Sequence, residues 1–295
     1  IISNWDPTGT NAGNTGSTDH TITIDAAAGA EANVTLEDVN IKTSGAAITT
    51  TGEGSVNIEL DGTNEVQSGT KHAGVEKTND GTLTITDTDQ DNGSLTANGG
   101  QRGAGIGGGK GGSGSDITIS GGEVTAKGGE YAAGIGGGEN GNGSHITIEG
   151  GTVTATGGGG AAGIGGGYGG AGSGITVSGG TVTATGGEDG AGIGSGKDAG
   201  SDGATNIKID KIDSGEVTAI GGNNGAGIGS GKNSSAKNIE VSKGTVKATG
   251  GINSAGIGGG GEGFGEHITV SGGIVEAKGK ENGAGIGGGN GGSGN

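Results

Sequence analysis

The sequence predicts an all-β protein, a right-handed parallel β-helix (solenoid) with three short strands in each coil of about 29 residues. The tetrapeptide Ala-Gly-Ile-Gly occurs seven times, and its isoleucines are 29 residues apart at every step except one of 35. Glycine pairs separate short segments in which apolar and polar residues alternate. Coils stacked about 4.8 Å apart then pair each strand with its equivalents around one apolar core. The repeat isoleucines are Ile106, Ile135, Ile164, Ile193, Ile228, Ile257 and Ile286.

Composition alone indicates a different class of chain. With 84 glycines in 295 residues, one proline, four aromatic residues and 27% apolar content, the protein has the composition of a disordered segment. The regular placement of the few apolar residues argues against disorder. A collagen triple helix is excluded because glycine does not occupy every third position and proline is nearly absent.

Each repeat contains three predicted strands. The first is Ile-Thr-Ile or a close relative, as in residues 117–119 and 146–148. The second is Val-x-Ala, as in residues 124–126 and 153–155, and the third is the Ala-Gly-Ile-Gly run itself. A period of two indicates strands, and the glycine pairs between them indicate corners. Ile, Val and Ala are therefore expected to point inward.

The single 35-residue interval places its six additional residues in two connections. Three of them extend the loop at residues 198–205, and three extend the corner at residues 211–214. The spacing of the predicted strands is otherwise preserved, as expected when insertions are confined to loops.

We expect three regions along the chain. Residues 1–20 are polar, hold the only Trp and the only Pro, and are predicted to form a cap or a linker. Residues 21–100 are predicted to form irregular coils, and residues 101–295 the regular 29-residue coils. Because solenoid ends need caps and Asn295 falls inside a predicted loop, we interpret the chain as a piece of a longer protein.

Charge and composition exclude several partners. The net charge is −17, from 32 acidic and 15 basic residues, which disfavours nucleic acid and anionic membranes. No stretch approaches 18 apolar residues, so no membrane span is predicted. The chain has no cysteine to form disulfides. An acidic, repetitive chain rich in Gly, Thr and Asn is typical of an extracellular bacterial protein.

Several segments resemble glycine-rich, adhesin-like repetitive surface proteins of Gram-positive bacteria, largely clostridial and gut species. They are residues 33–41, 81–85, 175–187 and 190–194. The Ser-Gly-Gly-Thr-Val portion within residues 175–187 is also similar to carbohydrate-binding β-helices that bind acidic plant polysaccharides. The resemblance covers most of residues 21–295. It implies an adhesin or stalk at the bacterial cell surface whose partner is a polysaccharide or a host or cell-wall glycan.

Stacking turns sequence positions into columns of neighbours, and one column suggests a ligand site. Arg102 and Tyr131 both lie four residues before a repeat isoleucine, so they are expected to be adjacent, with Tyr168 across the same sheet one coil further on. Arg102, the only arginine, is predicted to bind the carboxylate of an acidic sugar while the tyrosine ring contacts its apolar face. The alternative is a set of unrelated solvated loop residues. The same column predicts an amide ladder of Asn223 or Asn224, Asn253 and Asn282.

The glycines on either side of each repeat isoleucine are predicted to form an outer face with almost no side chains. Glycine in a strand often marks close approach of another backbone. A polysaccharide chain, a partner helix or the same face of a second molecule would fit there, which predicts self-association. The alternative is a face kept small for tight coiling or covered by a loop.

One acidic turn is a candidate metal site. Asp87, Asp89 and Asp91 alternate in a predicted turn and offer hard oxygen ligands for Ca²⁺. The following glycine, Gly93, falls one place later than in an EF-hand loop, and Asn98 stands where that loop has Glu. An ordinary acidic turn is the alternative.

No catalytic residues are predicted, and we expect a non-enzymatic protein. Parallel β-helix lyases and hydrolases need several carboxylates on adjacent coils. The outward strand positions here are mostly Thr, with charges predicted to form cross-coil ion pairs, Lys208 with Glu240 and Lys247 with Glu276. Two alternatives to glycan binding remain open, a passive spacer that displays another domain and a polysaccharide lyase-like enzyme.

Overall fold

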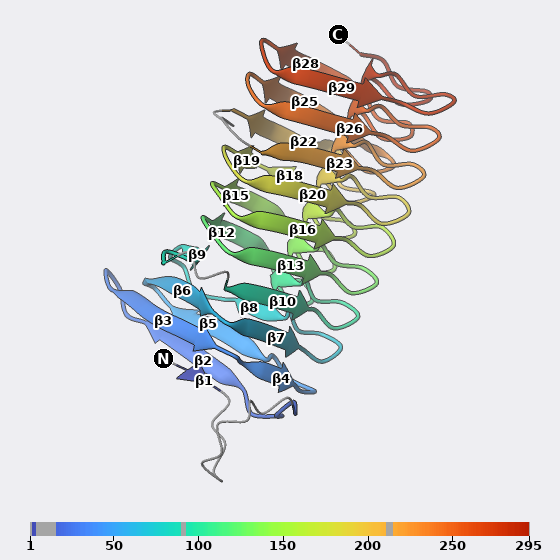
Figure 1. The fold of residues 1–295 in the computed structure, drawn as a ribbon. Coiled ribbons are helices and arrows are strands. Elements are labelled where there is room, and N and C mark those ends of the chain that lie inside the picture. Colours follow the sequence, from blue (N-terminus) through green and yellow to red (C-terminus); the bar gives the residue numbers. More distant parts are fainter. Residues whose placement is uncertain (1, 4–15, 90–92, 211–214, 295) are drawn as a thin grey trace.

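The chain forms a parallel β-helix in which three sheets run the length of the molecule (Figure 1). The computed structural model describes residues 2–3, 16–89, 93–210 and 215–294. These residues form strands, turns and loops without a helix, and every strand pairing is parallel. The predicted fold class is confirmed. Among the described residues there is therefore no apolar helix long enough to cross a membrane.

The first sheet, sheet A, contains the Ile-Thr-Ile strands and is eleven-stranded. Its order is β1 (Ile2–Ser3), β3 (Glu31–Glu37), β6 (Ser55–Asp61), β9 (Leu83–Thr86), β12 (Gly114–Ile119), β15 (Gly143–Ile148), β18 (Gly172–Ser173), β22 (Gly200–Ile209), β25 (Ser234–Val241) and β28 (Gly265–Val270), with β19 (Thr176–Val177) pairing with β15 and β22.

Sheet B is nine-stranded and contains the Val-x-Ala strands. Its order is β4 (Asn40–Lys42), β7 (Thr63–Gln67), β10 (Ser94–Asn98), β13 (Glu123–Lys127), β16 (Thr152–Thr156), β20 (Thr181–Thr185), β23 (Glu216–Ile220), β26 (Thr245–Thr249) and β29 (Ile274–Lys278).

Sheet C is ten-stranded and contains the Ala-Gly-Ile-Gly runs, of which only Ile-Gly is strand. Its order is β2 (Ile22–Ala26), β5 (Ile48–Gly52), β8 (Val75–Lys77), β11 (Ile106–Gly107), β14 (Ile135–Gly136), β17 (Ile164–Gly165), β21 (Ile193–Gly194), β24 (Ile228–Gly229), β27 (Ile257–Gly258) and β30 (Ile286–Gly287).

The register follows the sequence repeat. Ile106 pairs with Ile135, and Val124 with Val153, so residues 29 apart lie side by side. The loop insertion is accommodated within β22, whose pairing with β25 shifts register between Gly200 and Ala204. The second predicted insertion, residues 211–214, lies outside the described residues.

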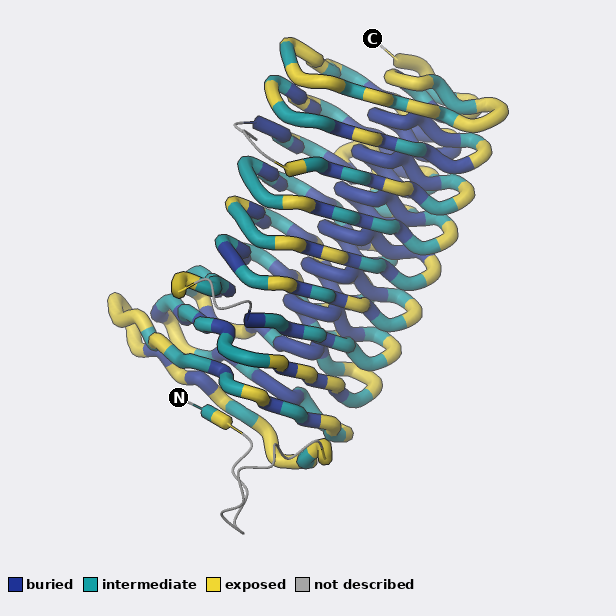
Figure 2. The backbone as a smooth tube through the Cα atoms, in the orientation of Figure 1, coloured by how far each residue is buried: buried dark blue, intermediate teal, exposed yellow. Residues whose placement is uncertain are grey.

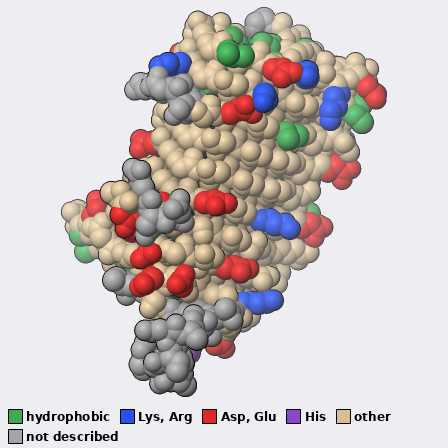
Figure 3. Space-filling model, in the orientation of Figure 1, with side chains coloured by type: hydrophobic (Ala, Val, Ile, Leu, Met, Phe, Trp, Pro, Cys, Tyr) green, Lys and Arg blue, Asp and Glu red, His purple; other side chains and the backbone are tan. Residues whose placement is uncertain are grey.

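The core is a continuous column of aliphatic side chains inside the three sheets. On β13, Val124 and Ala126 are buried while Glu123 and Lys127 are exposed, as the alternation predicted. Figure 2 shows the buried residues running through the middle of successive coils. Each fully buried Ile or Val contributes roughly 1.5–3 kcal/mol, and the contribution recurs in every coil. On the face in Figure 3, charged groups are sparse over most coils and acidic ones gather toward the N-terminal end.

The predicted glycine face is not a free surface. Gly105 and Gly107 are buried, and so are their equivalents in the next five coils. A Cβ on Gly107 would lie 2.1 Å from the carbonyl oxygen of Gly136 in the next coil. The prediction that a ligand, a partner helix or a second molecule binds this face is therefore wrong for these coils. The glycines permit tight coiling, because backbone occupies the space.

Beside sheet C, a loop of each coil is hydrogen-bonded to a loop of the previous coil. One loop precedes the Ala-Gly-Ile-Gly run and the other follows it. The amide four residues after a repeat isoleucine donates to the carbonyl four residues before the isoleucine of the previous coil. We call these two rows of residues, four before and four after the repeat isoleucines, the loop seam. Its bonds include Glu139 N to Arg102 O (3.0 Å), Tyr168 N to Tyr131 O (3.0 Å), Lys197 N to Gly160 O (2.7 Å) and Asn290 N to Asn253 O (2.8 Å).

The N-terminal end is described in part. Ile2 and Ser3 form β1 and pair with Leu36 and Glu37 of β3, so this part of the predicted cap or linker adds to sheet A. Thr18 forms an isolated parallel bridge with Ile41. The only tryptophan, Trp5, lies outside the described residues.

Candidate functional site

The loop seam brings the three predicted ligand-binding residues onto neighbouring coils. The rings of Tyr131 and Tyr168 lie edge to face, with centroids 6.2 Å apart and an interplanar angle of 87°. The equivalent pair one coil earlier is Arg102 and Glu139. The Glu139 amide donates to the Arg102 carbonyl, as the Tyr168 amide does to the Tyr131 carbonyl. The column predicted from the repeat spacing therefore exists, and its members are fixed by backbone hydrogen bonds.

Gly160 makes room for the ring of Tyr168. A Cβ at Gly160 would lie 2.5 Å from Cδ2 of that ring, so any side chain there would displace it. The ammonium of Lys197 lies 6.0 Å from the ring centroid, within cation–π distance. The Tyr168 hydroxyl donates to Oδ2 of Asp198 at 3.2 Å. The ring is thus held at its face, its edge and its hydroxyl.

Arg102 already has an ionic partner. Its Nη1 donates to Oε2 of Glu139 at 3.1 Å, and the Arg102 side chain is 37% exposed. Glu139 therefore competes with a sugar carboxylate for this guanidinium, and the binding role of Arg102 stays a prediction. Gln101 donates to Glu130 at 2.7 Å, and this bond lowers the pKa of the Glu130 carboxyl. The hydrogen bond with Glu130 raises the pKa of the Tyr131 hydroxyl.

The seam continues toward the C-terminus as polar side chains. Lys197 Nζ lies 2.9 Å from Oδ2 of Asp189, and Asn224 donates to Oδ1 of Asp189 at 2.7 Å. Burial opposes ionisation of Asp189, but these two hydrogen bonds lower its pKa. Asn253 donates to Asn224, and Asn282 to Asn253, both at 3.0 Å. The predicted amide ladder is confirmed, with Asn224 as its member in that corner.

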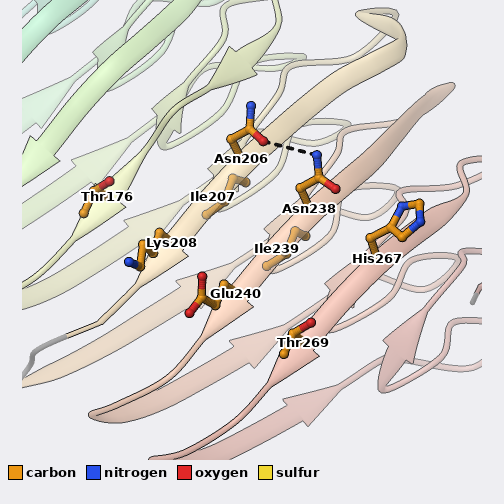
Figure 4. Close-up of a pocket in the computed structure, with 9 residues that line it drawn as sticks. All are labelled: Thr176, Asn206, Ile207, Lys208, Asn238, Ile239, Glu240, His267 and Thr269. Carbon is orange, nitrogen blue, oxygen red and sulfur yellow. Dashed lines mark hydrogen bonds between the residues drawn. The ribbon is translucent and has the colours of Figure 1, made fainter.

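A second surface, which the sequence analysis missed, lies on the outer face of sheet A. An open hollow of about 540 Å³ crosses β22, β25 and β28 (Figure 4). It is lined by Thr176, Asn206, Ile207, Lys208, Asn238, Ile239, Glu240, His267 and Thr269. Asn238 donates to Oδ1 of Asn206 at 3.2 Å, a bond that runs from one coil to the next (Figure 4).

The hollow follows a column of left-handed backbone. In six successive coils the residue directly before the first inward isoleucine of sheet A has a positive φ. Such a conformation is uncommon outside glycine, and Asn, Asp and His adopt it most often. The sequence carried this signal, since the position holds only those residues or glycine. The column is Asp116 (φ 56°), His145 (51°), Gly174 (62°), Asn206 (55°), Asn238 (56°) and His267 (53°).

The acidic turn forms a cluster with a residue from the neighbouring coil. Carboxylate oxygens of Glu59, Asp87 and Asp89 all lie within 4.8 Å of one another. Asp91 lies outside the described residues. Three carboxylates suit Ca²⁺, which takes oxygen ligands. Glu59 already accepts bonds from the Thr88 amide (2.6 Å) and hydroxyl (2.9 Å), so its orientation is fixed. Glu59 was missed because it is 28 residues from Asp87 and only strand pairing brings it close.

The predicted cross-coil ion pairs are wrong in their partners. The registers do place Lys208 beside Glu240 and Lys247 beside Glu276. Lys208 Nζ nevertheless lies 2.9 Å from Asp210, on its own coil, and Lys247 Nζ lies 2.8 Å from Glu216, on the preceding coil. Adjacent Cα positions do not decide which carboxylate a flexible lysine reaches.

A comparison with protein families identifies the repeat. A model described as a beta helix repeat matches seven segments that together cover more than half of the 295 residues. They are residues 91–110, 117–139, 146–168, 175–197, 211–232, 239–261 and 268–290. No curated protein and no solved structure matches the chain.

Proposed function

We propose that this chain, which belongs to the beta helix repeat family, is a non-catalytic module of a bacterial cell-surface adhesin or stalk that binds glycan through the loop seam. The observation that carries the proposal is the meeting of Tyr131 and Tyr168 on adjacent coils. A rigid aromatic pair offers apolar area at low entropic cost.

The surrounding charges favour a neutral sugar over an acidic one. Lys197 is paired with Asp189, and Arg102 with Glu139. Glu130 adds a further carboxylate beside Tyr131. Carboxylates accept hydrogen bonds from hydroxyl groups, and amides both accept and donate them, whereas a uronic acid would face more negative than positive groups.

The proposed extracellular location rests on composition and resemblance. The net charge of −17, the lack of cysteine and the Thr- and Gly-rich repeats fit an exported bacterial stalk. The tight, cross-bonded coils suit a rod that holds its binding residues at fixed spacing, because every coil contacts only its neighbours. A stalk role and a binding role are compatible in one solenoid.

A glycan array probed with the purified protein tests the proposal. We expect binding to neutral glycans in preference to polygalacturonate. Tyr168→Ala should weaken it about tenfold, which is 1.4 kcal/mol, while Thr154→Ala on sheet B should leave it unchanged. Tyr131→Phe keeps the ring and should retain most of the affinity.

Two outcomes would contradict the proposal. Wild-type protein that binds no glycan would favour the passive spacer. Release of unsaturated or reducing sugars from polysaccharides during incubation would favour the lyase-like enzyme. Each is read directly, the first on the array and the second by absorbance or reducing-end assay.

A further inference from the structure

We propose that the hollow on sheet A is a second sugar site, which takes a neutral oligosaccharide lying along the solenoid axis. The inference rests on the proposed glycan-binding function, but it uses residues of sheet A that are separate from the loop seam beside sheet C. Three observations carry it: the shape of the hollow, the backbone conformation of its wall, and its charges.

The shape suits a chain ligand that crosses the strands. Figure 4 shows Asn206, Asn238 and His267 in one row, with Lys208, Glu240 and Thr269 in a second row beside it. The rows run from coil to coil, so equivalent groups recur about every 4.8 Å along the axis. A volume of about 540 Å³ lies within the range of small-molecule sites, which is roughly 300–1,000 Å³. Repeated polar groups at a fixed spacing match a ligand that is itself a repeat.

The backbone conformation of the first row is the same at each of its three residues. Asn206, Asn238 and His267 adopt φ values of 55°, 56° and 53°. Left-handed backbone costs a non-glycine residue roughly 1–2 kcal/mol. Gly174 occupies the equivalent place in the preceding coil at φ 62°, so the fold accepts glycine there. Asn206, Asn238 and His267 are exposed, and the left-handed backbone, which recurs at other coils of the column, fixes where their side chains lie along the row.

The charges select a neutral ligand. Lys208 is the only lysine or arginine among the described residues that line the hollow, and its ammonium lies 2.9 Å from Asp210. Lys237, beside the first row, is bound to Asp202 at 3.0 Å. Glu240 is exposed and adds a negative charge. Within the part of the chain that the structure describes, an anionic ligand in the hollow would thus meet no unpaired lysine, whereas sugar hydroxyls find amide, imidazole, hydroxyl and carboxylate partners in the two rows.

The experiment is isothermal titration of the full chain with four hexasaccharides: cellohexaose, xylohexaose, chitohexaose and hexagalacturonate. We expect at least one neutral hexasaccharide to bind and hexagalacturonate not to. Asn238→Gly removes a lining amide and relieves the backbone, so the protein should melt no lower than wild type. We expect this variant to reduce the affinity of the sheet A site at least tenfold.

A matched control comes from the same column. His145 has a φ of 51° and lies outside the hollow, beside Asp116 at 3.4 Å. His145→Gly makes the same kind of backbone change, and it should leave the affinity unchanged. Tyr168→Ala alters the loop seam and should lower the affinity of that site. It should leave the affinity of the sheet A site unchanged.

The outcomes separate the two proposals. Binding that survives Asn238→Gly but is lost in Tyr168→Ala overturns the sheet A site and supports the loop seam. The reverse pattern supports the sheet A site alone. Equal loss in His145→Gly and Asn238→Gly overturns it, because the effect would then be general to the column. Failure of every hexasaccharide to bind overturns the sheet A site, while the glycan array decides separately on the loop seam. Tighter binding of hexagalacturonate overturns the charge argument.

Discussion

The irregular N-terminal coils and the regular C-terminal coils close their turns in different ways. In the N-terminal coils, sheet C strands such as β2 and β5 are five residues long, and polar side chains such as Asn64 and Asn79 are buried. In the C-terminal coils, the sheet C strands are two residues long and end in glycine. In the first region buried Asn side chains bond to the backbone. In the second region the backbones of adjacent coils are in direct contact at the strand glycines, and the buried polar side chains are mainly small serines.

Asn64 shows the first method. It is fully buried at the inward position that Leu95 and Val124 occupy in the next coils. Its Oδ1 accepts from the Val39 amide at 2.9 Å. Its Nδ2 donates to backbone carbonyls of Leu36, Asp61 and Ser94 at 3.2, 3.0 and 3.1 Å. One amide side chain thus satisfies four backbone groups of three coils.

Gly136 shows the second method. It has a φ of 130°, and a Cβ there would lie 2.0 Å from the carbonyl oxygen of Gly165. The same close contact between strand glycines recurs from coil to coil, at Gly107, Gly165 and Gly194 among others. The comparison teaches that buried polar side chains allow coils of unequal shape, whereas glycine requires every coil to be nearly identical.

The largest expected effect comes from Gly136→Ala. The new Cβ meets the backbone of the next coil, which cannot move independently, so we expect a loss above about 4 kcal/mol. Gly111→Ala is the matched control, since it also has a positive φ, 75°, but nothing lies within 4 Å. It should cost only about 1–2 kcal/mol. Thermal melting followed by circular dichroism measures both, and equal shifts would contradict the role assigned to backbone contact.

The second largest effect is expected for Asn64→Leu. The substitution leaves buried amide and carbonyl groups without partners, each at about 1–3 kcal/mol, and we expect a loss of about 3 kcal/mol overall. Urea unfolding measures the change. Val153→Leu, at the matching inward place of a regular coil, should cost less, about 1–3 kcal/mol from overpacking. A smaller loss in Asn64→Leu than in Val153→Leu would contradict the view that Asn64 organises its corner.

Calcium should affect the two regions differently, since the cluster of Glu59, Asp87 and Asp89 lies in the irregular coils. Calcium at about ten times its dissociation constant would stabilise the protein by about 1.4 kcal/mol. We expect chelation to lower the melting midpoint of wild type but not of Glu59→Gln combined with Asp89→Asn. Glu53→Gln, an exposed acidic residue of the same region, is the control and should keep the response. A midpoint that chelation leaves unchanged in wild type would remove the site.

The smallest effect concerns Lys77, whose side chain points inward from β8 and is 7% exposed. Burial lowers its pKa below the ordinary value of 10.5, although Asp116 and Asp80 oppose the shift. Between the lowered folded pKa and 10.5 the unfolded chain binds more protons, so this group makes stability rise with pH. Raising the pH from about 7 to about 10 should therefore stabilise wild type relative to Lys77→Met. Urea unfolding at several pH values measures the free energy of unfolding of both proteins. An equal dependence on pH in the two proteins would refute the role assigned to Lys77.

The repeat spacing was sufficient to predict which residues lie side by side. Tyr131 with Tyr168, and Asn224 with Asn253, follow from counting positions around the repeat isoleucines, because pairing in a parallel solenoid is fixed by sequence period. The direction of each side chain and its hydrogen-bond or ion-pair partner were less predictable. The prediction of an open glycine face was wrong. The alternation rule says which way a side chain points, and it does not say how close the backbone of the next coil lies.

The sequence by itself determined the architecture: period, strand identity, inward residues and the columns are all local or periodic properties. Tertiary structure decided what each column faces. Glu139 rather than a ligand pairs with Arg102, Glu59 joins the acidic turn, and the left-handed column borders a hollow on sheet A. These depend on distances of a few ångströms between separate coils, and such distances are set by packing of the whole solenoid.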